Sequence, residues 1–368
     1  MASIDRRPDG RWRARWREYP GGPQKARHFR RKLDAQRFLT RIEASQLDGT
    51  YRDPAAGRMP LREYGEIWRA GQVHRQSTAD RLEVELRLRI YKEFGDRPLA
   101  SVRPSEVQTW VKKLSAKLAP ATVELTVRTL ASLYRAAIRD RLVVSNPCDG
   151  VRLPEKPRQR VAPPPVEVVR ALDIAVPARY RAAVTLGAGA GLRQGEAFGL
   201  TVDRVDFLRR SVRIDRQLVT PKSGPSTLGP PKRPASVRTI PVGQVVTDVL
   251  AAHLSRFTPG QDGLIFTTEA GRPVARNRVA EVIKAAATKA KAPELRFHDL
   301  RHFYASALIR KGLSVKVVQA RLGHASAVET LDVYGHLWPD DEDRTRQAVD
   351  ELLGGELAED WLKTEAGE

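Results

Sequence analysis

Apolar and charged positions alternate near the start of the chain, over residues 11–17. Tryptophan and alanine share one face of this stretch, and arginines occupy the other face. Strict alternation predicts a β-strand with an apolar inner face and a cationic outer face. A turn rich in proline and glycine at 20–23 and a second basic strand at 25–31 extend this sheet. Apolar residues at helical spacing over 35–42 then predict a helix that backs it.

The pattern changes to a helical period further along the chain, where apolar residues recur every three or four positions. We therefore expect a small N-terminal β-sheet-plus-helix domain at 1–57 and a helical domain at 60–150. Residues 151–165 are rich in proline and basic residues, which is typical of an interdomain linker. The helices expected in the second domain are 61–69, 78–94, 104–114 and 121–139.

A third domain, at 166–353, mixes helical periods with a few short apolar stretches. The stretches at 202–207 and 211–218 predict a strand pair, and 237–242 predicts a further strand. The fold class expected for the chain is therefore multidomain and mainly α, ending in an α+β domain and an acidic tail at 354–368. The helices expected in the third domain are 166–176, 179–191, 244–256, 276–290, 297–311, 314–322, a short one that opens at Ser326 and carries Tyr334, and about 341–353.

The net charge of +20 on 368 residues changes this picture, because such a surplus attracts polyanions. Ribosomal and membrane-surface proteins share that property. Residues 1–32 hold 11 basic residues against three acidic ones, whereas residues 340–368 hold 11 acidic against three basic. The basic head favours nucleic acid, although a solvated sheet without a specific target has the same pattern. The DNA contacts expected there are Arg11, Arg13, Arg15, Arg17, Lys25 and Arg27.

The remaining composition excludes several classes of protein. The one cysteine, Cys148, allows no disulfide and no cysteine zinc site within a monomer. The N-terminus has no apolar signal core, and no apolar run could span a bilayer. We therefore expect the protein to work in a reducing cytoplasm. No paired carboxylates or histidine cluster stand out as a metal site, so we expect no metal and no cofactor.

Six residues of the third domain carry the chemistry needed to attack a phosphodiester without metal. Fixed cations would stabilise the negative charge of the transition state, and arginine binds two phosphate oxygens at once. A tyrosine is a suitable nucleophile, provided that nearby cations favour its phenolate. The leaving oxygen needs a proton from a general acid. The six candidates are Arg193, Lys232, His298, Arg301, His324 and Tyr334.

These residues resemble the tyrosine recombinases, specifically the phage-integrase type. The segment 191–196 is similar to the first arginine motif of that family, and 298–302 is similar to its second. The segments 322–324 and 334–336 resemble the end of the second motif and the nucleophile motif. Each motif alone is weak, but the four occur in order within one basic chain. The resemblance covers the third domain, and the three-domain order extends it to the whole chain.

The resemblance implies a role for each matching residue. Arg193 and Arg301 would clamp the scissile phosphate, while Tyr334 attacks it and forms a 3′-phosphotyrosine link. His324 would donate a hydrogen bond to the phosphate. Glu196, one turn after Arg193, would orient side chains of the active site.

The proton-transfer roles are the remaining ones that the resemblance implies. Lys232 would protonate the leaving 5′ oxygen, although Lys222 competes for this role. His298 would accept or donate a proton near the tyrosine. His302 and His336 are interpreted as packing or supporting groups.

The implied activity is that of a site-specific integrase of a phage or other mobile element. Its partners would be double-stranded DNA at core-type sites, bound by 60–353, and at arm-type sites, bound by 1–57, and it would act as a homotetramer. The resemblance leaves open whether a host bending protein and a directionality factor assist. A type IB topoisomerase-like nicking and resealing enzyme and a non-catalytic architectural DNA-binding protein are the alternatives.

Overall fold

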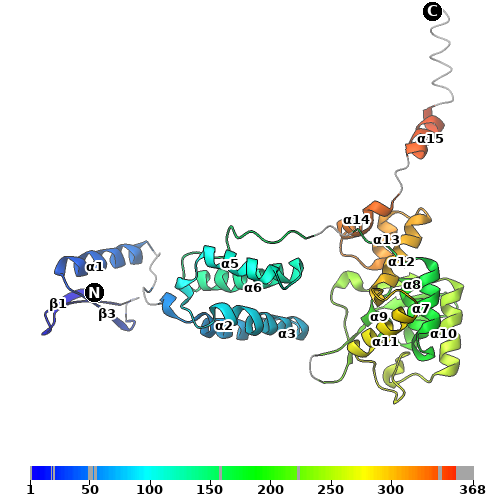
Figure 1. The fold of residues 1–368 in the computed structure, drawn as a ribbon, viewed down its shortest axis with the longest axis horizontal. Helices are drawn as coiled ribbons and strands as arrows, with labels where there is room; N and C mark the ends of the chain where they lie inside the picture. The colour runs from blue at the N-terminus through cyan, green and yellow to red at the C-terminus, as the bar shows by residue number, and fades with distance from the viewer. Residues whose placement is uncertain are drawn as a thin grey trace, which may run out of the picture. The chain divides into compact units, whose positions relative to one another are not determined.

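The computed structural model describes residues 2–17, 19, 21–48, 53, 56–156, 160–221, 224–338 and 342–353. The chain forms two compact units, Met1–Pro157 and Arg158–Glu368. Helices dominate both units (Figure 1), which confirms the predicted mainly α, multidomain class. Within the described ranges, no helix has the length and apolar character to cross a membrane. The predicted acidic tail, Lys222 and part of the predicted linker, at 157–159, lie outside the described residues.

The first unit begins with a three-stranded antiparallel sheet in the order β1-β2-β3. Alanine and tryptophan on the inner face of β2 pack against α1, and the rings of Trp16 and Phe38 meet edge-on at 5.0 Å. The first strand was not predicted, because it shows no clear alternation and is stabilised by pairing with β2. The elements are β1 (Ser3–Arg6), β2 (Trp12–Arg17), β3 (Gln24–Phe29) and α1 (Lys32–Leu47).

A helical core of its own completes the first unit. The predicted helix at 78–94 contains a π-helical segment at Leu86–Ile90, whose two end residues are buried. Cys148 packs partly buried against this core, and burial raises the pKa of its thiol to about 12. The helices are α2 (Leu61–Ala70), α3 (Gln76–Glu85), α4 (Tyr91–Phe94), α5 (Pro104–Ser115) and α6 (Pro120–Arg139), with 3₁₀ turns at Ala56–Arg58 and Leu99–Ser101.

The second unit is built around α8 and α12, which pack tightly because the contact between them contains a small residue. A Cβ at Gly187 of α8 would lie 2.9 Å from the side chain of Leu300 on α12. The helices of this unit are α7 (Val166–Ala175), α8 (Ala178–Ala190), α9 (Gln194–Phe198), α10 (Gln244–Arg256), α11 (Arg276–Lys289), α12 (Phe297–Arg310), α13 (Val315–Leu322), α14 (Ala327–Tyr334) and α15 (Glu342–Leu353), with 3₁₀ turns at Val202–Arg204, Pro234–Ser236, Gln261–Gly263 and Gly335–Leu337.

The strands of the second unit differ from the prediction. The predicted strand at 211–218 divides after Ile214, and its two halves join different sheets. The antiparallel sheet β4-β5-β8 contains the first half, and the hairpin β6-β7 contains the second. The chain changes direction at Asp215, whose carboxylate accepts hydrogen bonds from Arg204 and Arg216. The strands are β4 (Val205–Asp206), β5 (Ser211–Ile214), β6 (Gln217–Val219), β7 (Thr227–Gly229) and β8 (Arg238–Pro241).

Candidate active site

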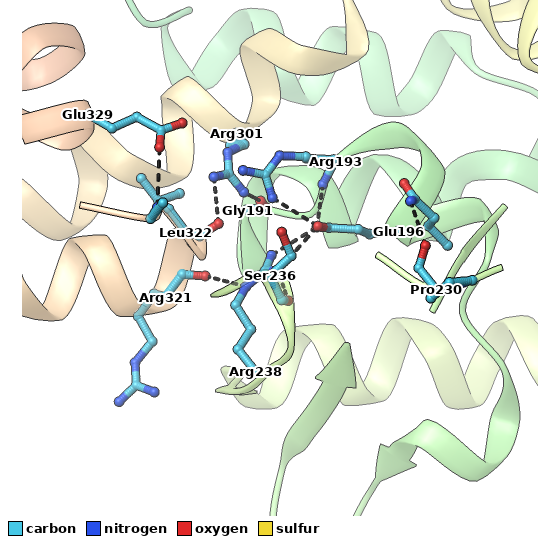
Figure 2. A network of polar contacts seen from close by, with 12 residues as sticks. Gly191, Arg193, Glu196, Pro230, Ser236, Arg238, Arg301, Arg321, Leu322 and Glu329 are labelled. Atoms are coloured by element: carbon cyan, nitrogen blue, oxygen red, sulfur yellow. Dashed lines mark hydrogen bonds and ion pairs between the residues drawn. The ribbon is translucent and has the colours of Figure 1, made fainter. Parts of the chain in front are cut away.

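Arg301, on α12, is fully buried at the centre of the site. Its guanidinium donates hydrogen bonds to the carbonyl oxygens of Gly191 (2.8 Å) and Leu322 (2.6 Å). Both carbonyls lie at the C-terminal ends of helices, α8 and α13, where the helix dipole favours a cation. Burial, followed by the charge of Arg193, lowers the pKa of Arg301 to about 9. Figure 2 shows this arginine held between two helix ends.

Arg193 is positioned by the turn after α8. The turn begins at Gly191, whose φ is 64°, and a Cβ there would lie 2.4 Å from the ring of Tyr304. Glycine is required on both grounds. The backbone N–H and the guanidinium of Arg193 each donate a hydrogen bond to the carboxylate of Glu196, both at 3.0 Å. These two hydrogen bonds form at the start of α9. The side chain of Arg193 is 35% exposed, so it remains accessible to a ligand.

Glu196 is buried and binds a second arginine, Arg238, that the sequence interpretation missed. Arg238, at the start of β8, donates to both carboxylate oxygens at 3.2 and 2.9 Å (Figure 2). It also donates to the carbonyl oxygen of Arg321 at 2.8 Å, next to the carbonyl that binds Arg301. Burial raises the pKa of the Glu196 carboxyl, but Arg238 and then Arg193 outweigh burial and hold it below its usual value. Arg238 therefore links the two predicted arginines. It shares the Glu196 carboxylate with Arg193, and it shares the C-terminal end of α13 with Arg301.

A signal for Arg238 is present in the sequence. Alternate residues of a strand share a face, so Arg238 is in phase with Ile240. Ile240 is buried in the core, whereas Val237 is exposed. An arginine on the buried face of a strand requires an acceptor there, and Glu196 supplies it.

His324 follows Gly323, the left-handed residue (φ 65°) that ends α13. The His324 ring is buried, and its Nδ1 lies 2.9 Å from the hydroxyl of Thr330 on α14. Burial, followed by the charge of Arg301, lowers the pKa of His324 to about 4, so the ring is neutral at pH 7. As the sequence predicts, α14 opens at Ser326, whose hydroxyl accepts from the Glu329 backbone N–H.

Tyr334 is the last residue of α14, and its side chain is buried. Its ring is stacked with that of His324, with centroids 6.4 Å apart and an interplanar angle of 11°. Burial raises the pKa of Tyr334 to about 12, although Arg301 and Arg193 act in the opposite direction. The two cations act in the expected direction and favour the phenolate, but burial outweighs them, so the phenol is protonated at neutral pH.

The imidazole that contacts the Tyr334 hydroxyl is His302, at 2.7 Å from its Nδ1. The interpretation of His302 as a packing or supporting group missed this contact. His298 lies one turn earlier on α12, exposed, with its ring edge-on to His302 at 4.8 Å. Although the residue is exposed overall, desolvation of its ring by the surrounding chain, followed by the charge of His302, lowers the pKa of His298 to about 4. His298, Arg301 and His302 lie at helical spacing on one face of α12. This spacing was the signal in the sequence that could have identified His302 as part of the site.

Lys232 is exposed on the segment between β7 and the turn Pro234–Ser236. Within the described part of the chain, it makes no hydrogen bond or ion pair to the site. The structure thus brings together five of the six predicted residues with Glu196, while Lys232 stands apart from their contacts. His336 lies next to Val161, with its Nε2 3.0 Å from that carbonyl oxygen.

The basic residues of the first sheet are divided between its two faces by the strand register. Lys25 and Arg27 pair with Trp16 and Ala14, on the face covered by α1. Lys25 forms an ion pair with Asp53 at 2.7 Å, and the Arg27 guanidinium lies over the rings of two phenylalanines. The uncovered face therefore carries the arginines of β2.

The arginines of that face are partly neutralised. Arg13 and Arg15 both bind Asp5 of the adjacent strand, at 2.8 and 3.2 Å. Arg17 donates to the carbonyl of Gly22, and Arg11 is exposed in the turn before β2. Across the described ranges, no group of three or more histidine, cysteine, aspartate or glutamate side chains could hold a metal ion.

A tyrosine at the end of a helix, next to two arginines anchored by helix ends and a carboxylate, defines a class of DNA strand-transfer enzyme. Residues 166–340 match the model of the phage integrase family. The chain is 27% identical over 333 residues to the putative prophage phiRv2 integrase of Mycobacterium tuberculosis, which covers 88% of each chain. It is 27% identical over 288 residues to the integrase of Mycobacterium phage FRAT1, covering 74% of this chain and 82% of the relative.

Two solved structures share the fold. The Tn1549 transposon integrase in complex with a circular intermediate DNA matches with a TM-score of 0.68 and 21% identity, over 80% of this chain and 99% of the other. A lambda integrase dimer bound to a COC′ core site matches with a TM-score of 0.60 and 18% identity, over 92% and 97%. Residues 166–340 therefore form a phage integrase family domain, and the chain is similar over most of its length to tyrosine recombinases and integrases.

Proposed function

We propose that this recombinase is the integrase of a phage or other mobile element, and that Tyr334 is its nucleophile. The observation that carries the proposal is the convergence of Tyr334, Arg301 and Arg193 from three separate elements of the second unit. Attack of the phenolic oxygen on a DNA phosphate would leave a 3′-phosphotyrosine and a free 5′ hydroxyl. Rejoining reverses these steps and consumes no ATP, because the ester bond is conserved in the protein–DNA link.

The arginines are proposed to bind the non-bridging oxygens of the phosphate. A guanidinium has five N–H donors, and Arg301 uses two of them on helix-end carbonyls. Arg301 is buried, so its remaining donors are proposed to meet a phosphate that binds next to the exposed part of Arg193. Because these cations are fixed before DNA arrives, they stabilise the transition state without reorganising.

His324 is proposed to donate to the same phosphate. With Nδ1 next to Thr330 and a pKa of about 4, the ring is neutral and can carry its proton on Nε2. Lys232 remains the proposed acid for the leaving 5′ oxygen, and Lys222 remains its competitor. Lys232 lies on an exposed segment, from which it would approach the leaving oxygen once DNA occupies the site.

Double-stranded DNA is the proposed partner, as in the DNA complexes of the Tn1549 and lambda integrases. Residues 60–353 would bind a core site, and residues 1–57 an arm site, so that two weak contacts raise the effective concentration at the core. The cytoplasm of a bacterial host is the proposed location, and a host bending protein and a directionality factor are proposed helpers.

The proposed active form is a tetramer, because a lambda integrase tetramer is known on a Holliday junction. Helix α15 would join the protomers, since Val349, Leu352 and Leu353 are exposed apolar residues on it. Truncation after Trp338 should abolish strand exchange and retain single-site binding. Full exchange by the truncated protein would contradict docking through α15.

A nicked suicide oligonucleotide tests the nucleophile. Wild type should form a covalent protein–DNA band, and Tyr334→Phe should form none. Tyr180→Phe is the matched control, because Tyr180 is a half-buried tyrosine that packs on Phe198 and lies outside the site. A band of wild-type intensity from Tyr334→Phe would assign the attack to another residue. The comparisons do not favour the topoisomerase-like or the architectural alternative.

A further inference from the structure

We propose that His302 accepts the phenolic proton of Tyr334 during strand cleavage, the role that the family resemblance assigns to His298. This inference rests on the proposed function, because it concerns the same nucleophile. It follows from one contact: the Tyr334 hydroxyl lies 2.7 Å from Nδ1 of His302.

The contact is held in place by both helices that form it. His302 directly follows Arg301 on α12, and Arg301 is tied by two hydrogen bonds to the ends of α8 and α13. Tyr334 ends α14, and its ring is fixed by His324 on one side and by the edge-on ring of His302 on the other, 5.5 Å away. The hydroxyl is therefore directed at His302 before DNA binds.

The protonation states of the pair suit this transfer. Burial, with Arg301 acting in the same direction and Asp299 opposing, lowers the pKa of His302, so the ring is neutral at pH 7. The titratable groups around His302 are Asp299, Arg301 and His298 from α12, and Tyr334 from α14. Tyr334 is protonated in its buried position, so its attack requires a base.

The step is balanced within the chain and the DNA. The O–H bond of Tyr334 breaks, its proton moves to Nδ1 of His302, and the phenolic oxygen forms a bond to phosphorus. The bond from phosphorus to the 5′ oxygen breaks, and that oxygen takes a proton from the separate acid, proposed above as Lys232. During rejoining the imidazolium of His302 returns its proton to the departing phenolic oxygen.

His298 occupies a different position. It is exposed, its ring meets His302 edge-on at 4.8 Å, and among the described residues the phenol of Tyr334 bonds to His302 and not to it. It is therefore placed to influence the charge of His302 and to contact DNA, whereas His302 is placed to take the proton.

The test uses the full chain and a nicked duplex that carries the core site, recovered first by selection from random-sequence duplexes. His302→Asn keeps an acceptor near the Nδ1 position but cannot hold the proton. We expect single-turnover cleavage to fall about 100-fold, within the range for loss of a general base, with DNA binding unchanged. His298→Asn removes the competing imidazole on the same helix, and comparison of its pH–rate profile with that of His302→Asn identifies which histidine takes the proton.

Two readouts separate a base from a merely structural residue. The wild-type rate should rise with pH and level off above the pKa of His302, whereas the rate of His302→Asn should keep rising, because hydroxide must remove the proton. A substrate with sulfur in place of the leaving 5′ oxygen needs no acid. It should restore cleavage by Lys232→Ala and leave His302→Asn slow.

Each result has one meaning. A levelling pH profile in His302→Asn, or cleavage at or above the wild-type rate, would overturn the inference and make His302 a residue that only restrains the tyrosine. If only His298→Asn lost the plateau in its pH–rate profile, the role of proton acceptor would return to His298. Absence of any covalent product from wild type on a duplex that it binds would instead overturn the proposed function.

Discussion

At the scale of single residues, Glu196 determines where two arginines lie. It accepts from Arg193 at the surface of the site and from Arg238 in the interior. The side chains of Glu196 and Arg238 are only 4% and 6% exposed, so neither charge is compensated by water. Positions of the cations in the site thus depend on one carboxylate that would not itself touch the phosphate.

Removing one member of this buried pair should be costly. Glu196→Gln or Arg238→Met should each lower the free energy of unfolding by about 3–5 kcal/mol, because the remaining charge is left buried without its partner. Urea unfolding followed by circular dichroism measures the change. The double variant should lose less than the sum of the two single losses; additive losses would show that the two side chains do not interact.

An exposed pair and the pH provide the controls. Arg278 and Glu281 form an ion pair in which both side chains are more than half exposed, so Glu281→Gln should change stability by about 0–1 kcal/mol.

The Glu196 carboxyl has a lowered pKa. Its stabilisation is therefore present above the pKa of the unfolded state and is lost as the pH falls through the lowered value. The difference between wild type and Glu196→Gln should shrink accordingly in acid.

The sequence predicted the residues with distinctive chemistry and spacing, and missed those defined by contacts. Arg301 and Tyr334 were found because their motifs recur in a known order. Arg238 and His302 were missed because their roles depend on partners far along the chain: 42 residues separate Arg238 from Glu196, and 32 separate His302 from Tyr334. Lys232 was predicted with Lys222 as its competitor, and among the described residues no contact of the exposed Lys232 side chain decides between them.

At the scale of elements, α14 is a short helix that positions the proposed nucleophile. It has eight residues, begins at a serine cap and ends at Tyr334. So short a helix is marginal alone, and its cap contributes a large share of its stability. The neighbouring helix α13 also begins at a serine cap, but its far end is held by hydrogen bonds from Arg238 and Arg301.

Removing the cap of α14 should therefore impair cleavage. Ser326→Ala should destabilise the helix by about 1 kcal/mol and slow covalent-complex formation, because Tyr334 would leave its position more often. Ser314→Ala removes the equivalent cap of α13 and should slow cleavage less. Suicide-substrate kinetics measures both, and equal slowing by the two variants would argue against a special dependence on α14.

Helices were easier to predict than strands. A helical period is contained within one segment, so most of the longer helices were predicted from apolar spacing, whereas the short helix α9 was not. Strands of two to four residues are stabilised by partners elsewhere, and the pairing of β5 with β8 joins residues that no local pattern connects. The π-helical segment at Leu86–Ile90 was missed for a related reason, since the helical spacing of its apolar residues gives no sign of it.

At the scale of the whole molecule, the N-terminal sheet and α1 have a separate small core. Its buried members come entirely from residues 14–42, and the helical core that follows draws on none of them. Loss of the first 57 residues should therefore leave the remaining chain folded.

Deletion of residues 1–57 should weaken integration and spare cleavage of a core-site oligonucleotide. Integration frequency and single-turnover cleavage, measured on the same preparations, test this. A full-length Arg11→Gln/Arg13→Gln variant separates the effect of charge from that of the fold, and should reproduce part of the loss. Unchanged recombination after the deletion would remove the bivalent model.

The partly buried thiol of Cys148 has a practical consequence for fluorescence studies of this enzyme. With its pKa raised to about 12, the sulfur stays protonated in neutral buffer and reacts slowly with maleimides. A dye can therefore be attached selectively to a cysteine introduced at the surface, for instance by Leu208→Cys in the fully exposed turn between β4 and β5. The natural cysteine can be kept, so labelled and unlabelled protein differ at that one position only.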